Sequence, residues 1–473
     1  ECDWSSDVCS SDLTGNDGFT EYAPRHVMAS WAQDNWTMGK LTLNLGMRYD
    51  VAVGAYVNWV EYQPFVKAGR PNDRNNLAPR LGFAYSLTDK TVLRGGYGRY
   101  YGTPTSQPAL FTLRGAQQVS ALLQNDGRPD FASNPFNGPA PTFDQAKARL
   151  CAFQADQTAV SGCIRSSFTN FVAPDLVDPY SNQSSLGFQH QLGALMSVEA
   201  DWTYSGDRSQ LRTLNTNQAY DVATGIPYPT GGAAALVNAN LKNRPYPGWG
   251  NTQQNRADGK ANYHALQTSF TRRMANHWQA SATYTLAKAW QYDVLPLNPG
   301  CQYPMTMNAA GQAVCNVPVT VVKDISENDW YVTGDQRHRV TFNGIWEMPH
   351  GFQLSGLYIF GDNGYATAQA GQDNRSIGVT TGRLRANGTV IARNGINLPS
   401  IHRMDMRLQR RFALGGKVKI DGIFEMYNVF NHTNYDPTGI VVNERNARFG
   451  LPASSTTLAY QPRMLQFGFR TQF

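Results

Sequence analysis

Charged residues that could take part in chemistry recur at alternate positions in several stretches. The candidates are Arg48, Asp50, Glu199, Asp201, Arg407 and Glu425. Paired carboxylates perform acid–base catalysis when they flank a reacting bond. However, Asp405 lies between Arg403 and Arg407, so mutual neutralisation along one face explains such charges better than catalysis does. We therefore expect these side chains to line a polar surface, and we predict no catalytic site.

Other catalytic or ligand-binding motifs are not found in the sequence. Residues 95–102 read Gly-Gly-Tyr-Gly-Arg-Tyr-Tyr-Gly, which lacks the spacing and the following helix of a dinucleotide fingerprint. There is no phosphate-binding loop, metalloprotease His-Glu motif or Gly-x-Ser-x-Gly elbow. The eight histidines are dispersed, and His338, between two arginines, is expected at an interface. We expect no enzyme activity, metal or cofactor.

Four of the six cysteines form two local pairs, Cys151 with Cys163 and Cys301 with Cys315. Local pairs in long polar segments are typical of disulfides in an oxidising compartment. A zinc site is the alternative, but no histidine lies at ligand spacing near either pair. The other two cysteines fall in residues 1–13, which resemble a translated sequencing adapter and show no signal peptide. We therefore expect an upstream truncation, with residues 14–473 as the protein proper.

These polar residues lie in stretches with a period of two, which is the side-chain period of a β-strand. In the clearest stretch, Leu41, Leu43, Leu45, Met47, Tyr49, Val51 and Val53 alternate with Thr42, Asn44, Gly46, Arg48, Asp50 and Ala52. The pattern predicts strands at about 22–38, 40–53, 77–88, 91–101, 181–192, 195–206, 261–273, 277–289, 337–347, 352–361, 400–412, 417–430 and 463–473. Almost every charge falls on the polar face, as lipid against the other face would require.

The composition suits an outer-membrane barrel. Charged residues make up 16% of the 473 residues and aromatic residues 12%, and no run of 18 apolar residues predicts a membrane-spanning helix. The net charge of +6 is small and scattered, which argues against nucleic acid as a partner. Short turns and long loops alternate between the predicted strands, as they do in such barrels. Aromatic residues near strand ends, such as Trp202 and Trp278, predict an interfacial girdle; a carbohydrate-stacking platform is the alternative.

The last strand alternates up to a terminal aromatic residue. Phe469 and Phe473 share its apolar face, a pattern expected of a barrel-insertion signal for the barrel-assembly machinery. The alternative is a buried edge strand of a soluble protein.

Several segments, in order, resemble the barrel of TonB-dependent outer-membrane receptors, the Oar-like group in particular. They include Leu41-Thr42-Leu43-Asn44-Leu45-Gly46-Met47-Arg48-Tyr49-Asp50, Ala78-Pro79-Arg80-Leu81-Gly82-Phe83-Ala84-Tyr85, Gly334-Asp335-Gln336-Arg337-His338-Arg339 and Glu425-Met426-Tyr427-Asn428-Val429-Phe430-Asn431-His432. The resemblance implies an all-β, antiparallel transmembrane barrel of roughly 22 strands, of which this chain holds about thirteen. It also implies an N-terminal plug, which contacts the TonB complex and which we expect to be missing here.

The predicted function is uptake of an unidentified solute across the bacterial outer membrane, in contact with its lipid. A passive porin or structural barrel without energy coupling is the first alternative. A soluble all-β binding protein is the second.

Overall fold

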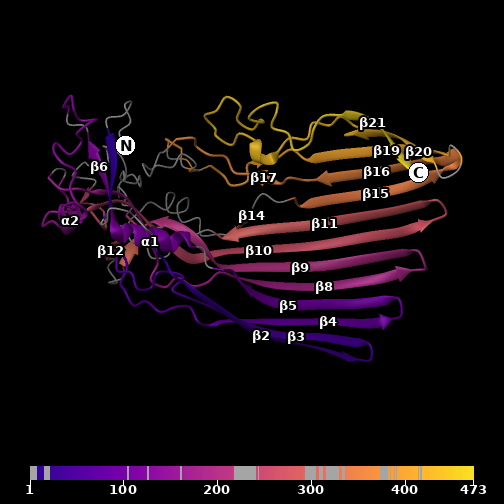
Figure 1. Ribbon diagram of the computed structural model, residues 1–473, viewed down its shortest axis with the longest axis horizontal. Helices are drawn as coiled ribbons and strands as arrows, with labels where there is room; N and C mark the ends of the chain where they lie inside the picture. Colours follow the sequence, from indigo (N-terminus) through magenta and orange to yellow (C-terminus); the bar gives the residue numbers. More distant parts are fainter. Residues whose placement is uncertain are drawn as a thin grey trace.

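The computed structural model describes residues 8–14, 22–103, 106–124, 127–159, 162–217, 241–242, 244–292, 305–307, 313–315, 330–332, 336–372, 382–383, 385–387, 389, 391–413, 415 and 418–472. Its main feature is one large sheet of mostly antiparallel strands (Figure 1). The helices of the described residues are short, and none combines the length and hydropathy that a membrane-spanning helix requires.

The sheet is a meander in which each long strand pairs with the next long strand along the chain. In order, the strands are β2 (His26–Met38), β3 (Leu41–Val53), β4 (Asn76–Thr88), β5 (Thr91–Tyr101), β8 (Tyr180–Leu192), β9 (Met196–Asn215), β10 (Trp249–Ala275), β11 (Trp278–Tyr292), β15 (His338–Met348), β16 (Phe352–Gly361), β19 (Ile401–Ala413), β20 (Lys419–Tyr427) and β21 (Met464–Gln472). Each overlaps one stretch in which the alternation predicts a strand.

The sheet is open. Within the described residues, β2 pairs only with β3 and β21 pairs only with β20, so the expected closed cylinder is not formed there. Closure would require both of these strands to be paired on both edges.

The register separates an apolar face from a polar face. Leu43 lies opposite Phe83, and Trp202 lies opposite Leu266 on the apolar face. Large apolar side chains on this face are exposed rather than packed against a second layer. In β2, Val27, Ala29 and Trp31 share the polar face, and the Trp31 ring centre lies 5.9 Å from the Arg48 guanidinium. Alternation alone did not show which face of this strand is the polar one.

Aromatic residues mark two levels on the apolar face. Trp278 and Trp290 both lie on β11, 12 residues apart, and Trp278 pairs with Trp346 of β15 near the hairpin ends. Twelve residues of a strand tilted by about 45° rise roughly 28 Å, close to the ~25 Å apolar band of an outer-membrane barrel. Charges on this face lie near these levels: Arg272 stacks 3.5 Å from the Trp278 ring centre, and Lys288 lies 4.4 Å from that of Trp290. The geometry favours the predicted girdle.

Short hairpins and long connections lie at opposite ends of the sheet (Figure 1). The hairpins include the 3₁₀ turn η3 (Pro349–Gly351) between β15 and β16. At the other end, the described residues within 54–75, 106–179 and 241–256 pack into a first loop assembly. The described residues within 362–372, 382–399 and 428–462 form a second loop assembly around Ile391, Ile396 and Ile440.

The first loop assembly has its own secondary structure. It contains α1 (Gln107–Gln117), β6 (Gln118–Gln124), α2 (Phe143–Ala148), the 3₁₀ turn η1 (Cys151–Phe153) and β7 (Ser166–Val172), and β1 (Val8–Thr14) pairs with β6. The remaining short elements are β12 (Met305–Met307), β13 (Ala313–Cys315), β14 (Trp330–Val332), β17 (Tyr365–Ala366), β18 (Ile396–Asn397) and η4 (Pro437–Gly439).

Two predicted strand ends are wrong. The sequence placed them at 206 and 261, whereas β9 continues to Asn215 and β10 begins at Trp249. The alternation is lost here because most residues of these extensions are polar or small on both faces. Of the apolar ones, Leu211 and Ala257 pack against the first loop assembly instead of lipid.

Candidate functional site

The six predicted charged residues lie on the polar face and form three separate groups. Arg48 donates to both carboxylate oxygens of Asp50, with Nε at 3.0 and 2.8 Å. Glu199 and Asp201 both contact Arg94, whose Nη2 lies 3.4 and 3.0 Å from their nearest oxygens. Arg407 and Glu425 are 3.9 Å apart. The structure therefore joins these residues as ion pairs along a wall and does not bring them together as one site.

Sequence reasoning missed the partners that come from other strands. Arg94 of β5 reaches across β8 to Asp201, and Asp421 of β20 accepts hydrogen bonds from Arg411 of β19 and Arg470 of β21. Register is needed to find such pairs, because their members lie far apart in the chain. Alternation places each residue on the right face but does not identify its neighbour.

Gly187 of β8 makes room for the pair between Arg94 and Asp201. A Cβ at Gly187 would lie 1.9 Å from Oδ1 of Asp201. We expect Gly187→Ala to displace this carboxylate, break the ion pair and cost about 1 kcal/mol of stability. The temperature at which the folded band is lost in a heat-modifiable gel should fall. Gly468→Ala is the control, because its Cβ meets nothing within 4 Å. Equal melting of both variants would contradict the prediction.

A cavity of about 630 Å³ lies against the polar face where β3, β4 and β5 contribute four glycines in place of larger side chains. Its lining includes Gln33, Asn44, Gly46, Arg80, Gly82, Gly96, Gly98, Tyr100, Gln183, Ser185, Thr203, Ser205 and Tyr263. We call it the glycine cavity. Gly82 lies directly opposite Gly96 across β4 and β5, and side chains from β2, β3, β8, β9 and β10 surround this pair.

The first loop assembly contains a second cavity of about 310 Å³. Its wall includes Tyr62, Phe153 and Trp249, and the Tyr62 and Trp249 rings meet edge to face at 5.9 Å. Phe65 stacks on Phe171 behind them, with ring centres 4.4 Å apart. These aromatic residues give the loop assembly a hydrophobic core, so it is a packed structure rather than a set of independent loops.

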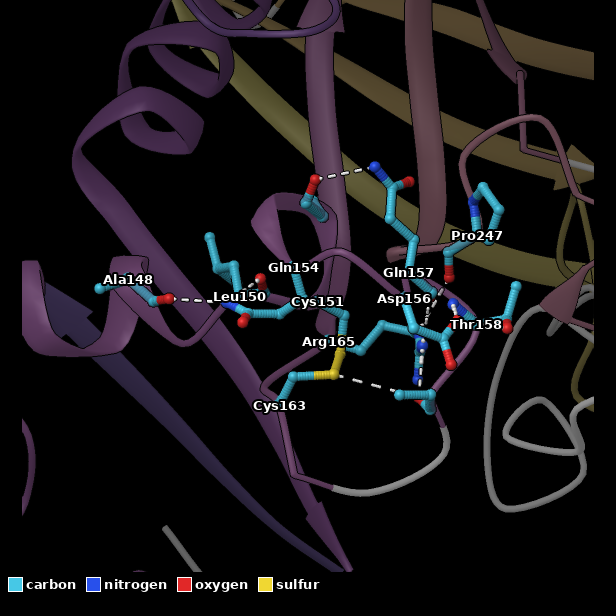
Figure 2. The surroundings of a disulfide bond; sticks show 12 residues. Ala148, Leu150, Cys151, Gln154, Asp156, Gln157, Thr158, Cys163, Arg165 and Pro247 are labelled. Carbon is cyan, nitrogen blue, oxygen red and sulfur yellow. Dashed lines mark hydrogen bonds between the residues drawn. A yellow bond between two sulfur atoms is a disulfide. The ribbon is translucent and has the colours of Figure 1, made fainter.

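Cys151 and Cys163 form a disulfide in this assembly (Figure 2). The nearby Arg165 side chain donates from Nη2 to the carbonyls of Gln157 and Ala159, and from Nε to that of Pro247 at 2.9 Å. These bonds join the disulfide loop to the segment before β10. The backbones approach so closely that a Cβ on Gly248 would lie 2.4 Å from Cα of Ala152.

Other predicted residues are only partly covered by the structure. Cys301 and Phe473 lie outside the described residues, and for Cys315 only the strand β13 is described. Phe469 lies on β21 with 80% of its surface exposed, on the apolar face.

In the described part of the chain, His, Cys, Asp and Glu side chains do not gather into a group of three or more that could hold a metal ion.

Asp178, just before β8, is buried next to other acids. Tyr56 Oη donates to it at 2.8 Å and Asn76 Nδ2 at 2.9 Å. Burial raises the pKa of Asp178, and the charges of Asp73 and Asp50 raise it further. Because Asp178 binds its proton more tightly in the folded state, protonation stabilises the fold at pH values below the unfolded pKa of about 3.9. This stabilisation is lost as the pH rises through the pKa of Asp178 in the folded protein.

We therefore expect the first loop assembly to lose stability as pH rises from about 4 toward neutral. Hydrogen exchange of residues 54–75 along this range, divided by the intrinsic base-catalysed rate at each pH, would show lower protection at the higher pH. Asp178→Asn should flatten the dependence. If the pH dependence of exchange is the same in this variant, groups other than Asp178 cause it.

The comparisons with known proteins agree with this architecture. A family model described as "Outer membrane beta barrel domain" matches residues 10–388. The chain belongs to this family. Membership places the barrel in the bacterial outer membrane with its apolar face toward lipid, which confirms the predicted location.

The comparison with solved structures found matches at low identity. The outer membrane transporter YddB from Escherichia coli is 14% identical with a TM-score of 0.50, and the match covers 94% of this barrel chain and 44% of that chain. A mutant of the ferric enterobactin receptor PfeA from Pseudomonas aeruginosa is 12% identical with a TM-score of 0.46, covering 94% and 44%. The siderophore receptor PirA from Acinetobacter baumannii is 11% identical with a TM-score of 0.46, covering 94% and 45%.

The barrel chain thus spans less than half the length of these solved proteins. No curated protein sequence matches it.

Proposed function

We propose that this chain is the barrel region of an Oar-like TonB-dependent transporter that takes up a solute across the outer membrane. The observation that carries the proposal is the sorting of the sheet. Its polar face holds neutralised ion pairs, its apolar face is exposed, and packed loop assemblies lie at the end opposite the hairpins. The sequence resemblance to TonB-dependent receptors and the fold shared with an outer membrane transporter support it.

Solute would be captured at the loop assemblies and then pass along the polar face, which forms the lumen wall. Arg48, Asp50, Glu199, Asp201, Arg407 and Glu425 would line this path. Because each arginine among them lies beside a carboxylate, the wall has fixed dipoles but little net charge. A plug would occupy the lumen and transmit energy from the TonB complex.

We also propose that the barrel-assembly machinery recognises the last strand, with the exposed Phe469 side chain as part of the insertion signal. Asp421 fixes this strand to its neighbours through Arg470.

Uptake by intact cells tests the proposal. The full-length gene product would be expressed in the outer membrane of cells with and without a functional TonB complex, and growth on scarce solutes would be compared. Growth that depends on both the protein and the TonB complex is the expected result. Growth or leakage of small solutes without the TonB complex would favour the passive porin. Recovery of the protein from the periplasm in soluble form would overturn both.

A further inference from the structure

The glycine cavity differs in chemistry from the rest of the polar face. Elsewhere arginines such as Arg48 and Arg94 lie against carboxylates. The cavity lining contains amide, hydroxyl and phenol groups and one cation, Arg80, and no carboxylate of the described residues is among it. A polar site without an acid, but with a cation, favours a ligand that carries hydroxyls and a negative charge.

Three side-chain amides of the cavity are free to bind a ligand. Within the described part of the chain, the side-chain amides of Gln33, Asn44 and Gln183 take part in no hydrogen bond with protein. Each amide offers two donors and one acceptor oxygen, so three of them can satisfy several hydroxyl groups at once. They come from β2, β3 and β8, which places them around the cavity rather than along one strand.

The two lining tyrosines that share the polar face, Tyr100 and Tyr263, have different roles. Tyr100 folds over Gly98, where a Cβ would lie 2.7 Å from its Oη, and the Arg80 guanidinium lies 4.8 Å from its ring centre. Tyr100 therefore helps to orient the cation. Tyr263, with 38% of its surface exposed, is the aromatic side chain left to contact the C–H face of a ring.

We propose that the glycine cavity is a binding site on the transport path for a sugar acid, meaning a small carbohydrate with a carboxylate. Its hydroxyls would bind the three amides, its carboxylate would accept from Arg80, and its ring would pack on Tyr263. The volume of about 630 Å³ is within the usual range for small-molecule sites. This inference rests on the proposed function and adds a solute class to it.

Binding to the full chain in detergent micelles tests the inference by titration calorimetry, without any energy source. The probes are a galacturonate disaccharide and the matching neutral galactose disaccharide. We expect the acidic probe to bind about tenfold more tightly, as a charge-assisted hydrogen bond would allow. Arg80→Gln should remove this difference while leaving the neutral probe unchanged. Equal affinities in the unmodified protein, or no binding of either probe, would overturn the assignment.

A second pair of variants locates the site. Gly82→Leu should fill the cavity and weaken binding of the acidic probe by about tenfold or more, because a Cβ fits at Gly82 with its nearest contact at 3.5 Å. Gly468→Leu is the matched control: it adds the same side chain to the polar face of β21, outside the cavity. An equal loss of affinity in both variants would show that the probe does not bind in the glycine cavity. Because no uptake is measured, absent binding together with intact TonB-dependent growth would reject this inference alone.

Discussion

Replacing Cys151 and Cys163 with serine is expected to destabilise the first loop assembly by about 3 kcal/mol. The bond closes a loop with a sequence separation of 12, and removing it restores freedom to the unfolded loop. The sheet should remain intact, because the meander is held by its own backbone pairing. Hydrogen exchange of residues 142–172 in the folded, membrane-inserted protein would measure the loss directly.

Reductant provides the control for this prediction. It should speed exchange in the unmodified protein to the level of the double variant and leave the double variant unchanged. If the two proteins exchange alike in oxidising buffer, the packing around Arg165 holds the loop without the bond.

Asp421→Asn is expected to weaken attachment of the last strand. The Asp421 carboxylate is 1% exposed and accepts from Arg411 at 2.7 Å and Arg470 at 2.7 Å. Without the negative charge of Asp421, the guanidinium groups of Arg411 and Arg470 repel each other beside the buried amide of the new asparagine. Breaking a buried ion pair costs about 3–5 kcal/mol, and we expect about 2 kcal/mol because both arginines are half exposed.

Glu425→Gln in the same strand is the matched control. Its contact with Arg407 is long, at 3.9 Å, and we expect this partly exposed pair to contribute about 1 kcal/mol at most. The folded band of the Asp421 variant should therefore be lost at a lower temperature in a heat-modifiable gel. Similar melting of the two variants would mean that β21 is held by its backbone bonds alone.

The sequence was most informative where lipid restricts the choice of residues. In β3, the alternation from Leu41 to Val53 matches the strand bounds, because one face of this strand must be apolar and the other need not be. The turn between β2 and β3 follows an equally local rule, since Gly39 has a positive φ of 60°, which favours glycine. Such rules act within a few residues and can be read from one segment.

The loop assemblies could not be read in this way. Tyr62, Phe171 and Trp249 form one core although they come from three distant segments. No period connects them, because each lies in a connection that folds back on the others. The ion pairs of Asp201 and Asp421 were missed for a related reason, since their partners depend on which strands are neighbours and in what register.

The length of β10 has a consequence for what can touch this protein from outside. A tilted crossing of the hydrocarbon core uses about 9–11 residues, so roughly 16 of its 27 residues extend beyond that layer. They pair with β9 as far as Asn215 opposite Gln253 and lead into the first loop assembly. In the proposed transporter, which has its long connections outside the cell, this extension would hold the first loop assembly above the cell surface. With that orientation, antibodies or bacteriophages that approach the cell would contact the first loop assembly before they reach the lipid.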